Sequence, residues 1–167
     1  MVLNLKGFLN GGDRTINIDT FLDFTKEEYG GVTLFAKPTK VVGKVVNKAD
    51  VTELSLMCDV TLNKPCDRCG KETVKELQIP IKRIIVSELS DDDNVELLLI
   101  ENDTLDLYEV CFSEILLALP MKHLCDDDCK GICSNCGKNL NDGPCGCETK
   151  SVDPRLEALL QLLEDED

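Results

Sequence analysis

Alternation of apolar and polar residues dominates the first half of the chain and predicts β-strands. From Val51 to Asn63, every second residue is apolar or threonine, the pattern of a strand with one buried face. Cys58 falls on that face, where a free cysteine packs as a small hydrophobe. The runs Thr39 to Asn47 and Thr73 to Val86 predict two more strands. Because Pro80 cannot donate a backbone hydrogen bond, we expect an edge strand or a bulge there.

A different spacing, typical of a helix, follows in the second half. Between Leu107 and Leu119, Asp106 is a candidate N-cap, Glu109 lies three residues later as in a capping box, and Pro120 ends the segment. Apolar residues nearly encircle this helix. We therefore expect it to be largely buried, with Cys111 in the core.

Two more helical signals lie nearer the ends of the chain. Thr20 to Tyr29 fits either a short helix or a loop that ends in a Gly-Gly turn. Near the C-terminus, Asp153 is a candidate N-cap and Pro154 suits the first helical position. The residues that follow have the spacing of one helical face: Leu156, Leu159, Leu160 and Leu163.

The charge of the chain is acidic but unevenly placed. The 167 residues include 32 Asp plus Glu against 18 Lys plus Arg, a formal net charge of −14. Residues 37–83 differ from this average, with ten basic and six acidic residues, so any RNA contact would have to use this segment. No apolar run approaches the ~20 residues of a membrane span. The first residues also lack the apolar segment of a signal peptide, and we expect a cytoplasmic protein without membrane contact.

Ten cysteines are present, and eight of them are clustered. Cys66-Asp-Arg-Cys69 and Cys133-Ser-Asn-Cys136 are each followed by glycine, which lets the backbone fold closely past the second sulfur. This C-x-x-C-G form is typical of a metal-binding knuckle. A redox dithiol is the alternative, but such a motif precedes a helix, whereas Cys66 lies between two predicted strands.

Eight thiolates fill two tetrahedral zinc sites, since zinc takes four sulfur ligands. Short loops favour a local site in the C-terminal cluster and leave the other four cysteines for a second site. Crossed pairings and a single occupied site are the alternatives at this stage. The predicted ligand sets are Cys66, Cys69, Cys125 and Cys129 for one ion, and Cys133, Cys136, Cys145 and Cys147 for the other.

Catalysis is not expected from these sites, because four cysteine ligands leave no position for a reactive water. The chain also lacks G-x-S-x-G, P-loop and G-x-G-x-x-G motifs, and its single histidine, His123, is expected to face solvent. An iron-binding or redox protein is one alternative, since paired knuckles also hold a single iron. A zinc-ribbon adaptor of the transcription machinery is another. Aromatic residues are only 4% of the chain, so surfaces for stacking RNA bases are scarce.

These elements predict an α+β fold. An antiparallel, β-rich N-terminal part with a buried helix is followed by a small cysteine-rich zinc module and a C-terminal helix. Residues 1–121 are expected to form the β-rich domain with one zinc knuckle. Residues 122–167 are expected to form the cysteine cluster with an amphipathic helix packed on it. Lys122 to Thr149 has almost no large apolar residue, so it cannot form a core of its own.

Five motifs occur in order along the chain: Cys66-x-Arg68-Cys69, Glu114-Ile-Leu-Leu-Ala-Leu-Pro120, C-x-x-x-C-x-G-[IL]-C-x-x-C-G-x-x-L-N from Cys125 to Asn141, a C-x-C pair, and Val152-Asp-Pro-Arg155-Leu. Together they resemble the bacterial YceD family over roughly Val41 to Leu163. The resemblance implies a factor needed for accumulation of the 23S RNA of the large ribosomal subunit. It brings no catalytic residues.

We therefore expect a non-enzymatic factor in ribosome biogenesis. Its expected partners are rRNA or a large-subunit precursor, or a basic ribosomal protein bound through acidic faces, and no small-molecule substrate. Three lysines lie about 13 Å apart on one face of a predicted strand, a spacing that can follow phosphates. Alternatively, they only protect a sheet edge from aggregation. The candidate RNA contacts are Lys40, Lys44 and Lys48, joined by Arg68, Lys82 and Arg83 if the third strand pairs beside the first two.

Overall fold

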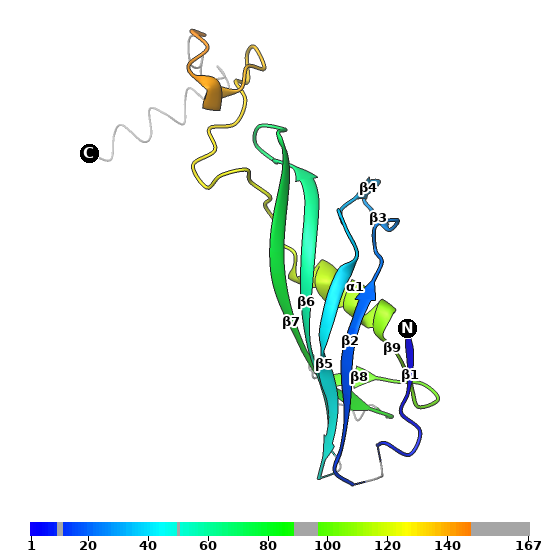
Figure 1. Ribbon diagram of the computed structural model, residues 1–167. Helices are drawn as coiled ribbons and strands as arrows, with labels where there is room; N and C mark the ends of the chain where they lie inside the picture. Colours follow the sequence, from blue (N-terminus) through cyan, green and yellow to red (C-terminus); the bar gives the residue numbers. More distant parts are fainter. Residues whose placement is uncertain (10–11, 50, 89–96, 148–167) are drawn as a thin grey trace, which may run out of the picture.

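A five-stranded sheet with the order β2-β5-β6-β7-β8 forms the centre of the molecule. The computed structural model describes residues 1–9, 12–49, 51–88 and 97–147. Neighbouring strands are antiparallel except β7 and β8. Helix α1 (Leu107–Ala118) lies across one face of the sheet, so the fold is α+β as predicted (Figure 1). The strands are β2 (Arg14–Leu22), β5 (Thr39–Lys48), β6 (Val51–Pro65), β7 (Glu72–Val86) and β8 (Leu97–Leu99).

Two small strand pairs and one short helix complete the described elements. They are β1 (Val2–Asn4) with β9 (Thr104–Asp106), β3 (Glu28–Tyr29) with β4 (Val32–Thr33), and the 3-10 helix η1 (Leu140–Asp142). The helix considered for Thr20 to Tyr29 is wrong. Thr20 continues the alternation of β2, and Gly30 and Gly31, both with positive φ, form the tight turn between β3 and β4. The Gly-Gly turn of the alternative is therefore confirmed, but the loop expected before it is limited to residues 23–27, because Thr20 to Leu22 belong to β2 and Glu28–Tyr29 form β3.

The core lies between the sheet and α1, and β6 supplies much of it. Its inward residues alternate as predicted, and Cys58 is fully buried. Gly43 allows β5 and β6 to approach closely, because a Cβ at this position would lie 2.1 Å from the carbonyl oxygen of Ser55. Among the described residues, only β6 pairs with β7 at Pro80, since β8 pairs with β7 from Ile84 to Val86. The edge position predicted for this proline is confirmed.

Helix α1 is less buried than its composition predicts. Asp106 caps it by accepting a hydrogen bond from the backbone N–H of Tyr108, and Cys111 is in the core as expected. However, only one stripe of the helix faces the sheet, and Leu117 is 81% exposed. The expectation of a largely buried helix was therefore wrong. The helix predicted after Asp153 lies outside the described residues, and among the described helices none is long and apolar enough to span a membrane.

The β6–β7 hairpin extends past the other strands, and the cysteine-rich segment lies at its tip (Figure 1). The pairing of β5 with β6 ends where Lys40 lies opposite Asp59, whereas β6 and β7 remain paired as far as Pro65 and Glu72. Beyond the pairing with β5, the segment around Phe35 covers part of β6 through a bridge to Leu62. The hairpin thus holds the first knuckle away from the hydrophobic core.

Candidate metal centres

The first cysteine tetrad joins the tip of the β6–β7 hairpin to the chain that follows α1. The Sγ atoms of Cys66 and Cys69 lie within 4.8 Å of those of Cys125 and Cys129. Two of the sulfur pairs are 3.8 Å and 3.6 Å apart, Cys66 to Cys129 and Cys69 to Cys125. A tetrahedral ion with bonds of about 2.3 Å requires sulfur separations of about 3.8 Å. The tetrad therefore has the dimensions of a four-thiolate metal site.

Polar contacts around Cys129 fix this tetrad in place. Arg68, from the knuckle, donates to the carbonyl oxygen of Cys129 at 2.8 Å. The side-chain amide of Asn141 donates to the Cys129 Sγ at 3.3 Å, and its oxygen accepts from the backbone N–H of Lys130. Gly131 passes so close to Arg68 that a Cβ there would lie 3.1 Å from the carbonyl oxygen of Arg68. Outer contacts of this kind orient metal ligands.

His123 is buried, which corrects the expectation that it faces solvent. Its side chain is 3% exposed, and Nε2 lies 2.6 Å from the hydroxyl oxygen of Thr73 on β7. Its backbone N–H donates to Asp67 at 2.7 Å, and its carbonyl accepts from the backbone N–H of Asp67. The histidine thus attaches the chain just before Cys125 to the base of the knuckle. A single sequence gives no sign of such a tertiary contact.

The second tetrad repeats the knuckle of the first. In both, the glycine after the second cysteine donates to the carbonyl of the first cysteine at 2.9 Å: Gly70 to Cys66 and Gly137 to Cys133. The Sγ atoms of Cys133 and Cys136 lie within 4.8 Å of those of Cys145 and Cys147. The two sets of four agree with the pairing favoured by loop length. The second set is more exposed than the first, which contains the buried Cys66 and Cys129.

The thiols of each tetrad differ in acidity, because the acidic ones accept hydrogen bonds. Desolvation opposes ionisation of Cys66, but backbone N–H donors lower its pKa to about 6. Backbone donors from Cys136 and Asn135 likewise lower the pKa of Cys133 to about 6. Neighbouring sulfurs, chiefly Cys129 and Cys136, raise the pKa values of Cys125 and Cys147 to about 12. Each cluster therefore already favours a thiolate, the form that binds metal.

Two groups of four cysteines can thus hold a metal ion each. Such a donor set suits zinc and also iron, and the arrangement itself does not select between them. Four protein ligands saturate a tetrahedral ion, so the sites have the closed form of structural centres. The remaining cysteines, Cys58 and Cys111, are buried in the β-rich core and belong to neither tetrad.

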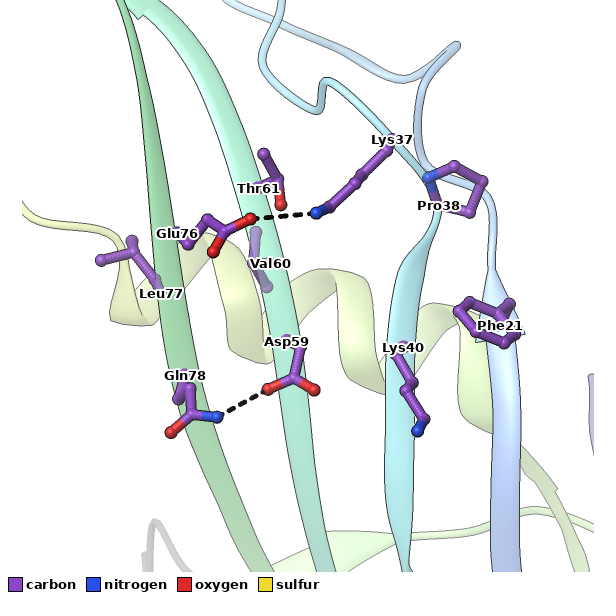
Figure 2. Close-up of a pocket in the computed structure, with 10 residues that line it drawn as sticks. All are labelled: Phe21, Lys37, Pro38, Lys40, Asp59, Val60, Thr61, Glu76, Leu77 and Gln78. Carbon is purple, nitrogen blue, oxygen red and sulfur yellow. Dashed lines mark hydrogen bonds and ion pairs between the residues drawn. The ribbon is translucent and has the colours of Figure 1, made fainter.

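The candidate RNA contacts fall in three different places. Lys40, Lys44 and Lys48 share the face of β5 turned away from α1, and Lys82 extends this outer face on β7, in register with Ser55 and Lys44. Figure 2 shows Lys40 on this face.

Arg83 and Arg68 do not extend this lysine patch, which corrects that part of the prediction. Arg83 lies on the helix side of β7, because neighbouring strand residues point to opposite faces. Its Nε and a terminal nitrogen contact Glu114 of α1 at 2.8 and 2.5 Å. Arg68 lies at the hairpin tip, where it binds the carbonyl of Cys129.

Comparison with known proteins places these features in a family. The sequence pattern described as "Large ribosomal RNA subunit accumulation protein YceD" matches residues 54–163, more than half of the chain. This chain belongs to the YceD family. Both cysteine tetrads lie inside the matched region, whereas Lys40, Lys44 and Lys48 precede it. The name of the YceD family supports a role in ribosome biogenesis.

Individual relatives of this YceD-family chain are similar over much of its length. "Uncharacterized protein YlbN" of Bacillus subtilis is 28% identical over 130 residues, which cover 74% of this chain and 76% of that protein. "Uncharacterized protein Rv2926c" of Mycobacterium tuberculosis is 27% identical over 104 residues, 59% of this chain. The chain spans about half, 49%, of the length of that mycobacterial protein. No solved structure is significantly similar.

Proposed function

We propose that this protein is a non-enzymatic factor in the assembly of the large ribosomal subunit, acting in the cytoplasm to support accumulation of 23S rRNA. The observation that carries the proposal is the family match over residues 54–163. That region includes the β6–β7 hairpin except for the first three residues of β6, together with α1 and both tetrads. The closed form of the tetrads agrees with a binding role, since it leaves the metals no open position for chemistry.

In this proposal both metals are zinc and both are structural. The first ion would join the hairpin tip to the segment after α1, through Cys66 and Cys69 on one side and Cys125 and Cys129 on the other. The second would close the loop between Cys133 and Cys147. Iron is the alternative, because four thiolates hold either metal. Colour and visible absorption of the purified protein separate them: zinc gives a colourless protein, and iron a coloured one.

The expected partner is rRNA within a large-subunit precursor. Lys40, Lys44 and Lys48 on the outer face of β5 would contact its phosphates. A basic ribosomal protein bound through the acidic surfaces is the alternative partner. Neither a membrane nor a small-molecule substrate is part of the proposal.

The functional test is the level of 23S rRNA in cells that lack the protein, measured against 16S rRNA. We expect a selective fall in 23S rRNA, restored by the wild-type gene. An unchanged ratio would refute the proposed function. The lysine contact is tested separately, by replacing all three lysines with glutamine.

The lysine variant is expected to bind precursor particles more weakly and with a flatter salt dependence, since phosphate contacts release counterions. Its metal content and Tm should remain close to wild type, because the three side chains are partly or fully exposed. Sedimentation of cell extracts over a salt series gives the binding, and unaltered particle association would exclude these lysines as the contact.

A further inference from the structure

Phe21 stands out on the outer face of the sheet. Its side chain is 66% exposed, although it lies in a nine-residue strand, β2, whose inward neighbours Ile18 and Leu22 are buried. Among the described elements, α1 covers the opposite face of the sheet (Figure 1). An aromatic ring left in solvent on an uncovered sheet face offers a flat apolar surface to a ligand.

Four outward side chains form one row across the sheet, starting at Phe21. The strand register places Phe21 opposite Lys40, Lys40 opposite Asp59, and Asp59 opposite Gln78. Directly paired residues on neighbouring strands are about 5 Å apart. Figure 2 shows the four side chains on the same face of β2, β5, β6 and β7. The row thus presents an aromatic ring, a cation, a carboxylate and an amide in succession.

The polar groups of this row are held in place but keep free hydrogen-bonding and charge-pairing capacity. The Gln78 side-chain amide donates to Oδ1 of Asp59 at 2.9 Å, which orients the carboxylate and leaves its second oxygen available as an acceptor. Lys40 forms no ion pair with any described residue, whereas Lys37 nearby is paired with Glu76 at 3.0 Å. The hollow that these residues line has a volume of about 580 Å³. Ligand pockets commonly fall in the range of about 300–1,000 Å³.

We propose that this row binds one unpaired nucleotide of single-stranded RNA. The base stacks on Phe21, the ammonium group of Lys40 contacts a phosphate, and the carboxylate of Asp59 accepts a hydrogen bond from an exocyclic amine of the base. Proteins commonly recognise single-stranded RNA by stacking bases on aromatic side chains and binding their edges. The inference rests on the proposed role at rRNA and adds a residue, Phe21, and a base preference to it.

The composition of the row favours a nucleotide over a protein partner. A protein interface has a contiguous apolar centre depleted of charge, whereas here a cation and a carboxylate directly follow the ring. The carboxylate of Asp59 would repel a phosphate. Its presence in the row therefore favours a contact with the edge of a base over a contact with the phosphate backbone alone. Cytosine and adenine carry an exocyclic amine that a carboxylate can accept from, and uracil carries none.

The experiment uses the full chain with its metals bound and fluorescently labelled single-stranded oligonucleotides of cytidine, adenosine or uridine. Fluorescence anisotropy gives the affinities. Phe21→Ala should weaken binding of the cytidine and adenosine oligonucleotides about 5- to 150-fold, the loss of one stacked base. Phe21→Tyr should restore it. The matched control is Val74→Ala. Val74 is 64% exposed on β7, on the same outer face of the sheet as Phe21, and this variant should bind as wild type.

Two more variants separate the roles of the neighbouring groups. Lys40→Gln should flatten the dependence of log affinity on log salt by about 0.7, the value for one phosphate contact on a single strand. Phe21→Ala should leave this slope unchanged. Asp59→Asn should remove the preference for cytidine over uridine. Absence of binding by the wild type, or equal affinities of wild type and Phe21→Ala, would overturn the proposal.

A protein partner would be revealed by crosslinking in cells. If Met57→Ser, in the adjacent row with Val42, abolished a crosslink to a protein while no RNA crosslink depended on Phe21, the nucleotide site would be refuted. The proposed function fails by a different result, an unchanged 23S rRNA level in cells without the protein. Loss of affinity in Phe21→Ala together with that result would retain the site and refute the function.

Discussion

Residues 1–121 and 122–147 are stabilised in different ways. Of the buried apolar and cysteine residues that the structure describes, Cys129 is the single member in residues 122–147, and the others lie earlier in the chain. The earlier part buries a sheet against α1. The later part has two thiolate tetrads, short backbone hydrogen bonds and the attachment through His123. Hydrophobic burial therefore accounts for the first region, and in our proposal metal binding stabilises the second.

The largest expected effect is that of metal removal. Chelation should abolish protection from hydrogen exchange in residues 124–147 and leave the paired core of β5, β6 and β7 protected. The reason is that structural zinc contributes apparent free energies of ~10–16 kcal/mol to small modules, whereas the sheet retains its own core. Hydrogen exchange with mass spectrometry, before and after complete removal of metal, measures this. Unchanged exchange in residues 124–147 would show that the module folds without metal.

The part stabilised by burial was also the part more fully predicted from sequence. A strand with one buried face imposes a period of two, so β6 and β7 and the inward position of Cys58 follow from local pattern. The two tetrads followed from a different local rule, because short loops close at low entropic cost. The exposure of Leu117 did not follow, because composition shows how apolar a helix is but not how much of its circumference other elements cover.

Two further corrections concern contacts between residues far apart in the chain. The pairing of Arg83 with Glu114 and the burial of His123 against Thr73 each depend on strand order and on how the module sits at the hairpin. Asn141, which supports Cys129, belongs to the motif that resembles the YceD family, so a signal for it is present in the sequence. Phe21 was overlooked because its segment was considered for a helix, although the alternation of β2 places it outward.

A core substitution should affect the first region and leave the metals in place. Ile115 is fully buried between α1 and the sheet, and Ile115→Ala should lower the free energy of unfolding by about 2–5 kcal/mol. Leu117→Ala on the same helix should change it by less than about 0.5 kcal/mol, because that side chain is exposed. Denaturation monitored by circular dichroism gives the free energies, and metal analysis should give equal contents for both variants. A loss of metal in Ile115→Ala would show that the two regions are not independent.

A smaller effect is expected from the ion pair between α1 and β7. Glu114→Gln removes the charge that faces the guanidinium of Arg83, and both side chains are mostly buried, with 18% and 22% exposed. Hydrogen bonds to charged groups contribute about 1.5–3 kcal/mol, so we expect a destabilisation within or below this range. Thermal melts of Glu114→Gln, Arg83→Met and the double variant measure the coupling. If the two single effects simply added, the pair would not contribute as a pair.

Native mass spectrometry of freshly purified, reduced protein tests most directly whether two four-thiolate metal centres hold the cysteine-rich segment. We predict two zinc ions per chain, with one lost in Cys133→Ser and a different one lost in Cys66→Ser. Cys58→Ser is the matched control, because that cysteine lies in the core and outside both tetrads, and it should retain two ions. Zero or one metal ion on the wild-type chain would contradict the account.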